Sequence, residues 1–187
     1  MLETIQNMDG SMLIKFQSLS IHDSLTPIVK IYTHLGDTGL MWIVIAVLLL
    51  IFKRTRKYGL LMLVSLALTY LVNNLLLKEL IDRTRPYEVF DKVQRLIEKQ
   101  RDSSFPSGHS ASSFAAAMCI YLNGYKRYGI PLLLLALLMA LSRLYVGVHY
   151  PGDVVTGAII GSLMAWLVYK LYDARQEALH PAKHRRR

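Results

Sequence analysis

Cysteine is almost absent from this sequence: among 187 residues only Cys119 is a cysteine, and it lies in an apolar run. A single cysteine forms no intrachain disulfide, so the chain is not a disulfide-stapled scaffold. Internal repeats and low-complexity tracts are absent too, and the stretch from Met1 to about Gly36 lacks the basic start, dense apolar core and small-residue cleavage site of a signal peptide. The sequence therefore predicts one domain over residues 1–187.

Acidic residues are scarce as well: 13 Asp and Glu stand against 22 Lys and Arg, giving a net charge of +9, while 53% of the residues are apolar. That combination favours a small polytopic membrane protein over a soluble domain. The basic residues form short clusters beside apolar runs, at 53–57, 126–127 and 185–187. This placement is typical of membrane topology signals, so we expect a lipid bilayer as partner and no nucleic acid.

Five apolar segments are long enough to approach a membrane span. They are Gly39–Phe52, Tyr58–Leu77, Ser110–Leu122, Ile130–Leu144 and Val154–Tyr172. Residues 1–36 are apolar only intermittently, which predicts an interfacial helix followed by a weak first span. The chain would then cross the membrane five or six times, and we expect six. The core then covers 37–173, and residues 174–187 form a basic tail. The basic clusters fall on alternate connections, which predicts a cytoplasmic C-terminus and an extracytoplasmic face for the other connections.

Three polar clusters lie at the outward ends of these segments. The first runs from Lys78 to Arg85-Pro86, and Arg143 belongs to the third. Taken singly, Lys78 and Arg85 are ordinary snorkelling residues at a helix end. Ionisable residues at membrane depth are costly, however, and three cations together are suited to bind a group with several negative charges.

The second cluster, Pro106-Ser107-Gly108-His109, directly precedes an apolar segment. Ser107 is placed to cap that helix, and the free N–H groups and positive helix end would form an anion cradle. Gly108 leaves room for a phosphoryl group near the backbone, and His109 lies in the first turn. The alternative is a plain helix cap followed by an interfacial histidine.

In the third cluster, His149 and Asp153 are four residues apart. A carboxylate at that spacing can hydrogen-bond one imidazole nitrogen and make the other a better nucleophile. Metal binding is the competing use of these residues, but three nearby cations would repel a dication. We therefore expect covalent catalysis without a metal ion or cofactor.

Read in order, the three clusters resemble the type 2 phosphatidic acid phosphatase family, whose signatures are K-x6-R-P, P-S-G-H and S-R-x5-H-x3-D. Every signature position is matched between Lys78 and Asp153, including Ser142 ahead of Arg143. The resemblance implies an all-α, six-helix transmembrane bundle, of the fold shared by soluble acid phosphatases and vanadium haloperoxidases.

The resemblance also implies roles for the motif residues. His149 would attack phosphorus to form a phosphohistidine, Asp153 would orient it, and His109 would protonate the leaving oxygen. The phosphate-binding group would stabilise the equatorial oxygens and comprises Lys78, Arg85, Ser107, Gly108 and Arg143. A nucleophilic and an acidic histidine need different protonation states, which predicts a bell-shaped pH profile, and the resemblance predicts inhibition by vanadate.

The sequence favours a phosphatase of a membrane lipid, with undecaprenyl diphosphate as the preferred substrate. Phosphatidylglycerol phosphate and phosphatidate stay open as substrates, because the motifs read only the phosphoryl group. Two further alternatives are a lipid phosphotransferase and a non-catalytic protein that binds anionic lipid. The site would face the extracytoplasmic side of the cell membrane, and the oligomeric state is left open.

Three features lie outside the motifs or allow more than one interpretation. The small-xxx-small pattern Gly157–Gly161 indicates close helix packing, within the chain or in a dimer. The stretch Lys92–Asp102 alternates in charge and is either a short external helix or a solvated loop. The histidines outside the motifs are interpreted as interfacial or solvated: His22, His34, His180 and His184.

Overall fold

The computed structural model describes residues 2–179, and the side chains from residue 4 onward; within this part of the chain every regular element is a helix. In chain order the elements are α1 (Leu2–Ser20), α2 (Thr26–Leu35), η1 (Asp37–Gly39), α3 (Leu40–Ile51), α4 (Arg56–Tyr70), η2 (Leu71–Leu77), α5 (Lys78–Ile81), α6 (Pro86–Val89), α7 (Gly108–Leu122), α8 (Lys126–Tyr145) and α9 (Pro151–Leu179). The all-α class is confirmed.

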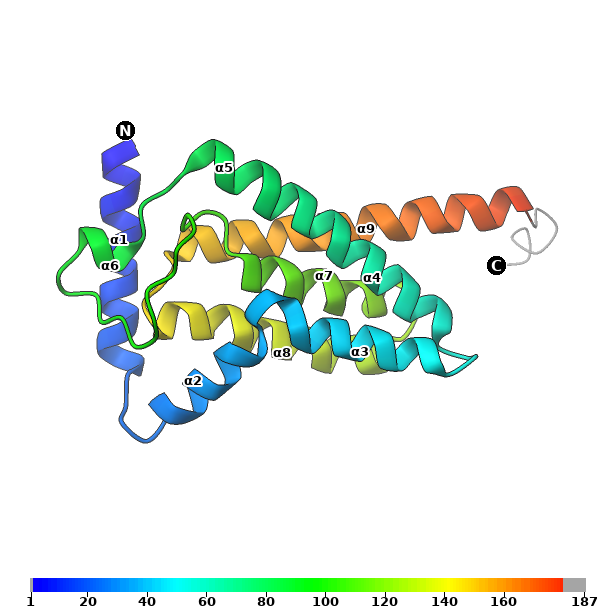
Figure 1. The fold of residues 1–187 in the computed structure, drawn as a ribbon, viewed down its shortest axis with the longest axis horizontal. Helices are drawn as coiled ribbons and strands as arrows, with labels where there is room; N and C mark the ends of the chain where they lie inside the picture. Colours follow the sequence, from blue (N-terminus) through cyan, green and yellow to red (C-terminus); the bar gives the residue numbers. More distant parts are fainter. Residues whose placement is uncertain (1, 180–187) are drawn as a thin grey trace.

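Helices α3, α4, α7, α8 and α9 run side by side as a bundle, with α7 at its centre (Figure 1). The core between them consists mainly of small or apolar side chains, among them Trp42, Met62, Ala116 and Ala136. The indole of the buried Trp42 donates a hydrogen bond of 2.8 Å to the hydroxyl of Ser113. Alanines on α7 let its neighbours approach closely, because dispersion contacts inside a membrane depend on close packing.

The closest approach is between α7 and α9, at the Gly157–Gly161 pattern. A Cβ atom at Gly157 would overlap the carbonyl of Ser107, and one at Gly161 would overlap the carbonyl of Ala111. Packing within the chain, the first of the two interpretations of this pattern, is therefore the use that the structure shows.

Replacing Gly161 by Val should lower the stability of the fold by about 2–4 kcal/mol, since the extra atoms meet backbone that cannot rotate away. Thermal unfolding in detergent measures this effect. The control is Leu163→Val, two residues along on the exposed face of α9. Equal melting temperatures for the two variants would contradict the packing argument.

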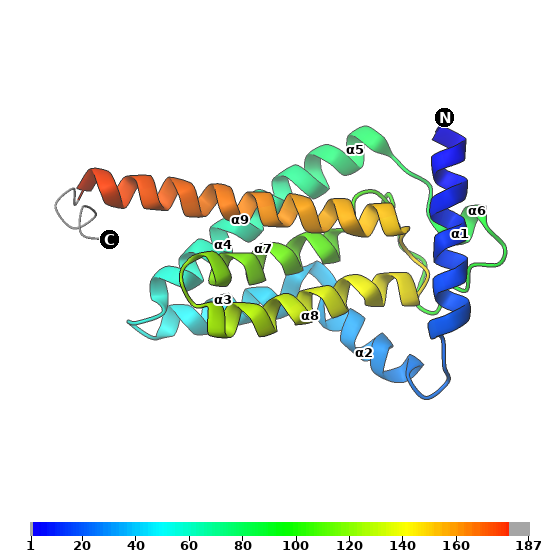
Figure 2. The same ribbon diagram turned by 180° about the vertical axis from the view of Figure 1, so that it is seen from behind.

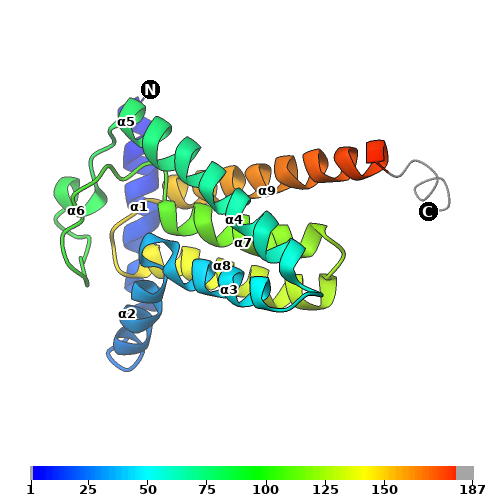
Figure 3. The same ribbon diagram turned by 45° about the vertical axis from the view of Figure 1, so that its right-hand side comes forward.

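One end of the bundle is built from the N-terminal and loop segments. α1 crosses that end at a steep angle to the bundle, and α2, α6 and the loop after α6 lie beside it (Figure 2). The buried amide of Gln17 fixes α1 there, donating to the carbonyls of Gln94 (2.9 Å) and Tyr145 (3.0 Å). At the opposite end, α9 extends beyond the other helices (Figure 3).

Three helical stretches are long and apolar enough to cross a membrane: 56–89, α8 and α9, with α2 and η1–α3 as a fourth if that bent pair counts as one span. Large apolar side chains on α8 and α9 are exposed, including Leu134, Leu138 and Ile159, as expected for surfaces that face lipid. The chain is thus a multi-pass membrane protein.

Six spans are not confirmed. α7 has only 15 residues, short of the length that a bilayer requires, and α2 is bent by 48° against the helix that follows it. Each of the five predicted apolar segments nevertheless coincides with a helix or a helix pair. The stretch Lys92–Asp102 forms a loop, so the helical alternative for it is wrong. In the predicted tail, 174–179 continue α9, and 180–187 lie outside the described residues.

Candidate active site

A cavity of about 880 Å³ opens at the α1 end of the bundle. Its polar side is lined by motif residues, namely Lys78, Arg85, Gly108, His109, Arg143 and His149. One flank is apolar and comes from α3 and α4, with Ile43, Leu63, Leu66 and Ala67. The lining also includes further polar side chains, among them His34, Asp37, Asn74, Glu98 and Asp102. The cavity therefore joins a charged end to a hydrophobic flank, as a site for an amphipathic ligand requires.

The predicted nucleophile, His149, lies in the short connection between α8 and α9 and is 2% exposed. Burial, together with the positive charges of Arg85 and Arg143, outweighs the effect of Asp153 and lowers the pKa of His149 to about 3. The imidazole is consequently neutral at ordinary pH, and a neutral ring has the lone pair that nucleophilic attack needs.

Asp153 is fully buried in the first turn of α9 and is surrounded by donors. One carboxylate oxygen accepts from the guanidinium of Arg83 (2.6 Å), and the other accepts from the Ser104 hydroxyl (2.5 Å) and the Tyr150 N–H (2.9 Å). The Nδ1 atom of His149 lies 3.5 Å from that second oxygen, longer than a good hydrogen bond. His149 and Asp153 therefore face each other as predicted, but at a distance that is loose for a hydrogen bond.

Ser107 caps α7 as predicted, with its side chain accepting from the N–H of Ser110 at 3.4 Å. Its own N–H is not free, however, because it donates to the carbonyl of Asp153 at 3.1 Å. The amides of Gly108 and His109 follow in the first turn, where a helix offers no acceptor of its own. The anion cradle predicted at this helix end therefore lacks the N–H of Ser107 as a donor. That N–H instead bonds α7 to Asp153, the predicted partner of His149.

The three cations differ in their partners. Arg85 donates to the carbonyl of Val148 (2.7 Å) and, with Lys78, pairs with the two carboxylate oxygens of Asp102. Arg143 is almost completely buried and donates to the Thr33 hydroxyl at 2.6 Å. Its Nε atom has no hydrogen-bond partner among the residues that the structure describes. Arg143 thus has donor capacity left for a ligand in the cavity.

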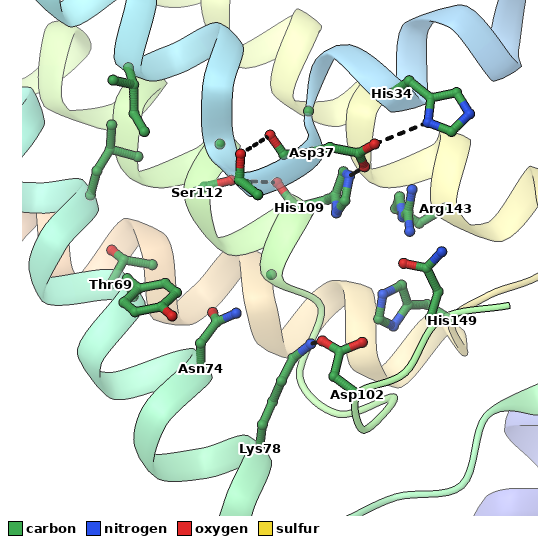
Figure 4. A pocket seen from close by; sticks show the side chains of 18 of the residues that line it. His34, Asp37, Thr69, Asn74, Lys78, Asp102, His109, Ser112, Arg143 and His149 are labelled. Atoms are coloured by element: carbon green, nitrogen blue, oxygen red, sulfur yellow. Dashed lines mark hydrogen bonds and ion pairs between the residues drawn. The ribbon is translucent and has the colours of Figure 1, made fainter. Parts of the chain in front are cut away.

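Asp102 lies in the loop between α6 and α7 and was not expected in the site. Although burial alone would raise the pKa of Asp102, its hydrogen bond to Lys78 and the charge of Arg85 hold it at about 2. The carboxylate therefore stays ionised as pH falls until about pH 2. Its two oxygens bind the two cations much as a pair of phosphate oxygens would, and Figure 4 shows the contact with Lys78.

Asp102→Asn should release Lys78 and Arg85 for an incoming anion, so inhibition by vanadate should tighten about 3- to 10-fold. Vanadate inhibition curves on the two proteins, with Asp91→Asn as the exposed control, measure this change. Weaker inhibition of Asp102→Asn would mean that the carboxylate instead holds the cations in their binding geometry.

Three further acidic or basic residues in the site lie outside the predicted set. Arg83 joins Asp153 to Asp9 of α1, with 2.9 Å between its Nη2 atom and the Asp9 carboxylate. Asp37 lies 3.0 Å from Nε2 of His109. Arg83 stands inside the first motif, which was a signal for it; Asp9 and Asp37 are more than 70 positions from their partners and carry no local signal.

All eight predicted site residues are therefore close to one cavity. Six line it, while Ser107 and Asp153 stand behind the lining and are hydrogen-bonded to each other through their backbones. Among the described residues, no group of three or more His, Cys, Asp or Glu is arranged to hold a metal ion. The metal-free mechanism stays a prediction.

Fold and site together define a class: a multi-pass helical membrane protein with a cavity lined by three cations and three histidines. The model of the PAP2 superfamily matches residues 58–177. The chain belongs to this superfamily, which confirms the resemblance drawn from the three motifs.

Relatives and solved structures agree with that assignment. The chain is 35% identical over 127 residues to an undecaprenyl-diphosphatase of Sulfolobus acidocaldarius, which covers 68% of this chain and 61% of that protein, so the match spans less than two thirds of the relative. A lipid A 4'-phosphatase of Bacteroides thetaiotaomicron is 30% identical, over 90% of this chain and 79% of its own. The crystal structure of a transmembrane PAP2 type phosphatidylglycerolphosphate phosphatase from Bacillus subtilis aligns with a TM-score of 0.74 and 30% identity, covering 92% of this chain and 87% of that one.

Proposed function

We propose that this chain is a lipid phosphatase that hydrolyses a phosphate or diphosphate monoester of a membrane lipid through a phosphohistidine on His149. One observation carries the proposal: a buried, neutral histidine borders a cavity that has three cations at one end and an apolar wall from α3 and α4. A headgroup phosphate fits the charged end, and a lipid chain fits the flank.

In the first step Nε2 of His149 attacks the terminal phosphorus and a P–N bond forms. The P–O bond to the leaving group breaks, and that group is the lipid alcohol of a monophosphate or the lipid phosphate of a diphosphate. His109 gives its proton to the departing oxygen, while Asp153 accepts the hydrogen bond from Nδ1 of the phosphorylated ring. Lys78, Arg85 and Arg143 offset the charge on the equatorial oxygens. In the second step water attacks phosphorus while His109 takes a proton from it, and the P–N bond breaks. Phosphate is released, and neutral His149 and protonated His109 are regenerated.

The preferred substrate is undecaprenyl diphosphate, because the S. acidocaldarius relative carries that activity in its name. Phosphatidylglycerol phosphate is the second candidate, supported by the B. subtilis structure that covers 92% of this chain. We place the cavity on the extracytoplasmic side of a six-span bundle and the C-terminus in the cytoplasm, on the distribution of basic clusters.

The test is phosphate release by the purified protein in detergent with EDTA, from undecaprenyl diphosphate, phosphatidylglycerol phosphate and phosphatidate, beside His149→Ala. We expect hydrolysis by the wild type in EDTA and none by the variant, with the best substrate identifying the lipid. Activity only with added metal would overturn the mechanism. Transfer of the phosphoryl group to a second lipid in place of water would favour a phosphotransferase. Lipid binding without turnover would favour a non-catalytic binding protein.

The pH dependence follows from the lowered pKa of His149. A histidine near its ordinary value would lose nucleophilicity as pH falls through about 6.5, whereas a group with a pKa of about 3 stays neutral down to that pH. We therefore expect kcat/KM not to fall between pH 7 and pH 5, because His149 stays neutral over this range and the acid, His109, can only gain its proton as pH falls. A tenfold fall from pH 7 to pH 5 in a protein that stays folded would contradict this assignment.

A further inference from the structure

The connection between α2 and α3 brings two ionisable side chains to His109. The carboxylate of Asp37 lies between two imidazoles, with one oxygen 3.0 Å from Nε2 of His109 and the other 3.0 Å from Nδ1 of His34 (Figure 4). Both oxygens are thus used by histidines. Asp37 is the first residue of the 3-10 helix η1, and the hydrogen bonds of its carboxylate join it to the two imidazoles.

The backbone next to Asp37 is strained. Thr38, directly after Asp37, has φ 54° and ψ 11°, a left-handed conformation that is unfavourable for a side chain with a branched Cβ. At Gly36, before Asp37, a Cβ would come within 2.8 Å of Cδ2 of His109 and 2.7 Å of Met139. The loop therefore packs its backbone directly against the His109 ring, and a strained residue follows the carboxylate.

The groups facing His109 can be named from each element around it. α2 contributes His34 and the backbone of Thr33, and η1 contributes Asp37. α8 contributes Arg143, a buried cation whose charge disfavours a second positive charge on His109. Asp37 is the anion that opposes Arg143 at this position.

We propose that Asp37 is the positioning residue of the acid: it accepts a hydrogen bond from Nε2 of His109 and directs Nδ1 of the same ring, with its transferable proton, into the cavity. The other ring nitrogen of His109 points away from Asp37 into the cavity in Figure 4. His34, about half exposed, holds the second oxygen of Asp37 and connects the carboxylate to solvent. Asp37 precedes residues 58–177, so the segment ahead of the matched range completes the site.

The inference rests on the proposed function, in which His109 protonates the leaving oxygen. An alkoxide leaves poorly and needs that proton, whereas p-nitrophenolate leaves without it. Removing the positioning carboxylate should therefore slow an alkyl ester far more than an aryl ester, and loss of its negative charge should move the alkaline limb of kcat to lower pH.

The experiment compares wild type, Asp37→Asn, Asp37→Glu and the exposed control Asp23→Asn on dioctanoyl phosphatidate and p-nitrophenyl phosphate in detergent. We expect Asp37→Asn to lower kcat about 10²-fold on the alkyl ester and less than about 5-fold on the aryl ester, the lower end of what an acid contributes. Asp37→Glu should regain part of the alkyl activity, and Asp23→Asn should match the wild type.

Equal losses on the two esters with an unchanged pH profile would assign Asp37 a structural role and overturn the inference alone. Unchanged activity of Asp37→Asn would also overturn it. A wild type that, like His149→Ala, releases phosphate neither from these esters nor from undecaprenyl diphosphate would overturn the proposed function and the inference with it.

Discussion

Asp153→Asn should lower the turnover of the best lipid substrate about 10⁴-fold. Each oxygen of Asp153 faces donors, Arg83 on one side and Ser104 and Tyr150 on the other, so an amide group must place its NH₂ against another donor. The acceptor that fixes the His149 tautomer is lost or turned away, and loss of such an acceptor in a catalytic triad has an effect of this size.

Steady-state kinetics in detergent measure the loss, beside Asp91→Asn, which removes an exposed carboxylate in the loop after α6. The melting temperature of each variant separates loss of catalysis from loss of fold, because Asp9 would then be the one ionic partner of Arg83 among the described residues. A folded Asp153→Asn with more than a tenth of the wild-type activity would show that His149 needs no carboxylate.

Arg143→Lys should reduce kcat about 10³-fold although it keeps the charge. The guanidinium uses Nη1 for Thr33 and has Nε without a partner among the described residues, so it can hold the α2 hydroxyl and a phosphoryl oxygen at once. A lysine is a point charge that cannot reproduce this fork. An arginine that stabilises charge in phosphoryl transfer contributes about 10³- to 10⁵-fold.

The control is Arg127→Lys, an exposed arginine at the start of α8, far along that helix from Arg143. Burst and steady-state measurements of phosphate release separate the two chemical steps. If Arg143→Lys kept its kcat and raised only KM, the arginine would bind the headgroup equally in the ground and transition states.

Much of the site was predictable because its motifs flank helices. Lys78, His109 and His149 stand at ends of apolar segments that the alternation of basic clusters places on one side, so their convergence follows from topology. The number of spans was less predictable, because α7 is surrounded by other helices, and its 15 residues need not match the thickness of the bilayer.

The partners of the motif residues were not predictable from one sequence. Asp9 and Arg83 are 74 positions apart, and Asp37 and His109 are 72 apart, so neither pair leaves a periodic or local pattern. Asp102 belongs to a stretch of alternating charge. In such a stretch the sequence carries no signal that distinguishes a carboxylate that binds two cations from a solvated one. The predicted role of His34 as a solvated residue was incomplete, since it is half exposed and also bonded to Asp37.

The position of α1 has a practical consequence for expression and design. Asp9 accepts hydrogen bonds from Arg83 and from the backbone N–H of Gly152, so α1 is bonded to the start of α9 and to the arginine that binds Asp153. A fragment trimmed to the matched range 58–177 would retain every motif residue and yet lack Asp9, Gln17 and Asp37. Motif-complete truncations of this kind would look intact in a sequence comparison and would be poor reagents for inhibitor screening.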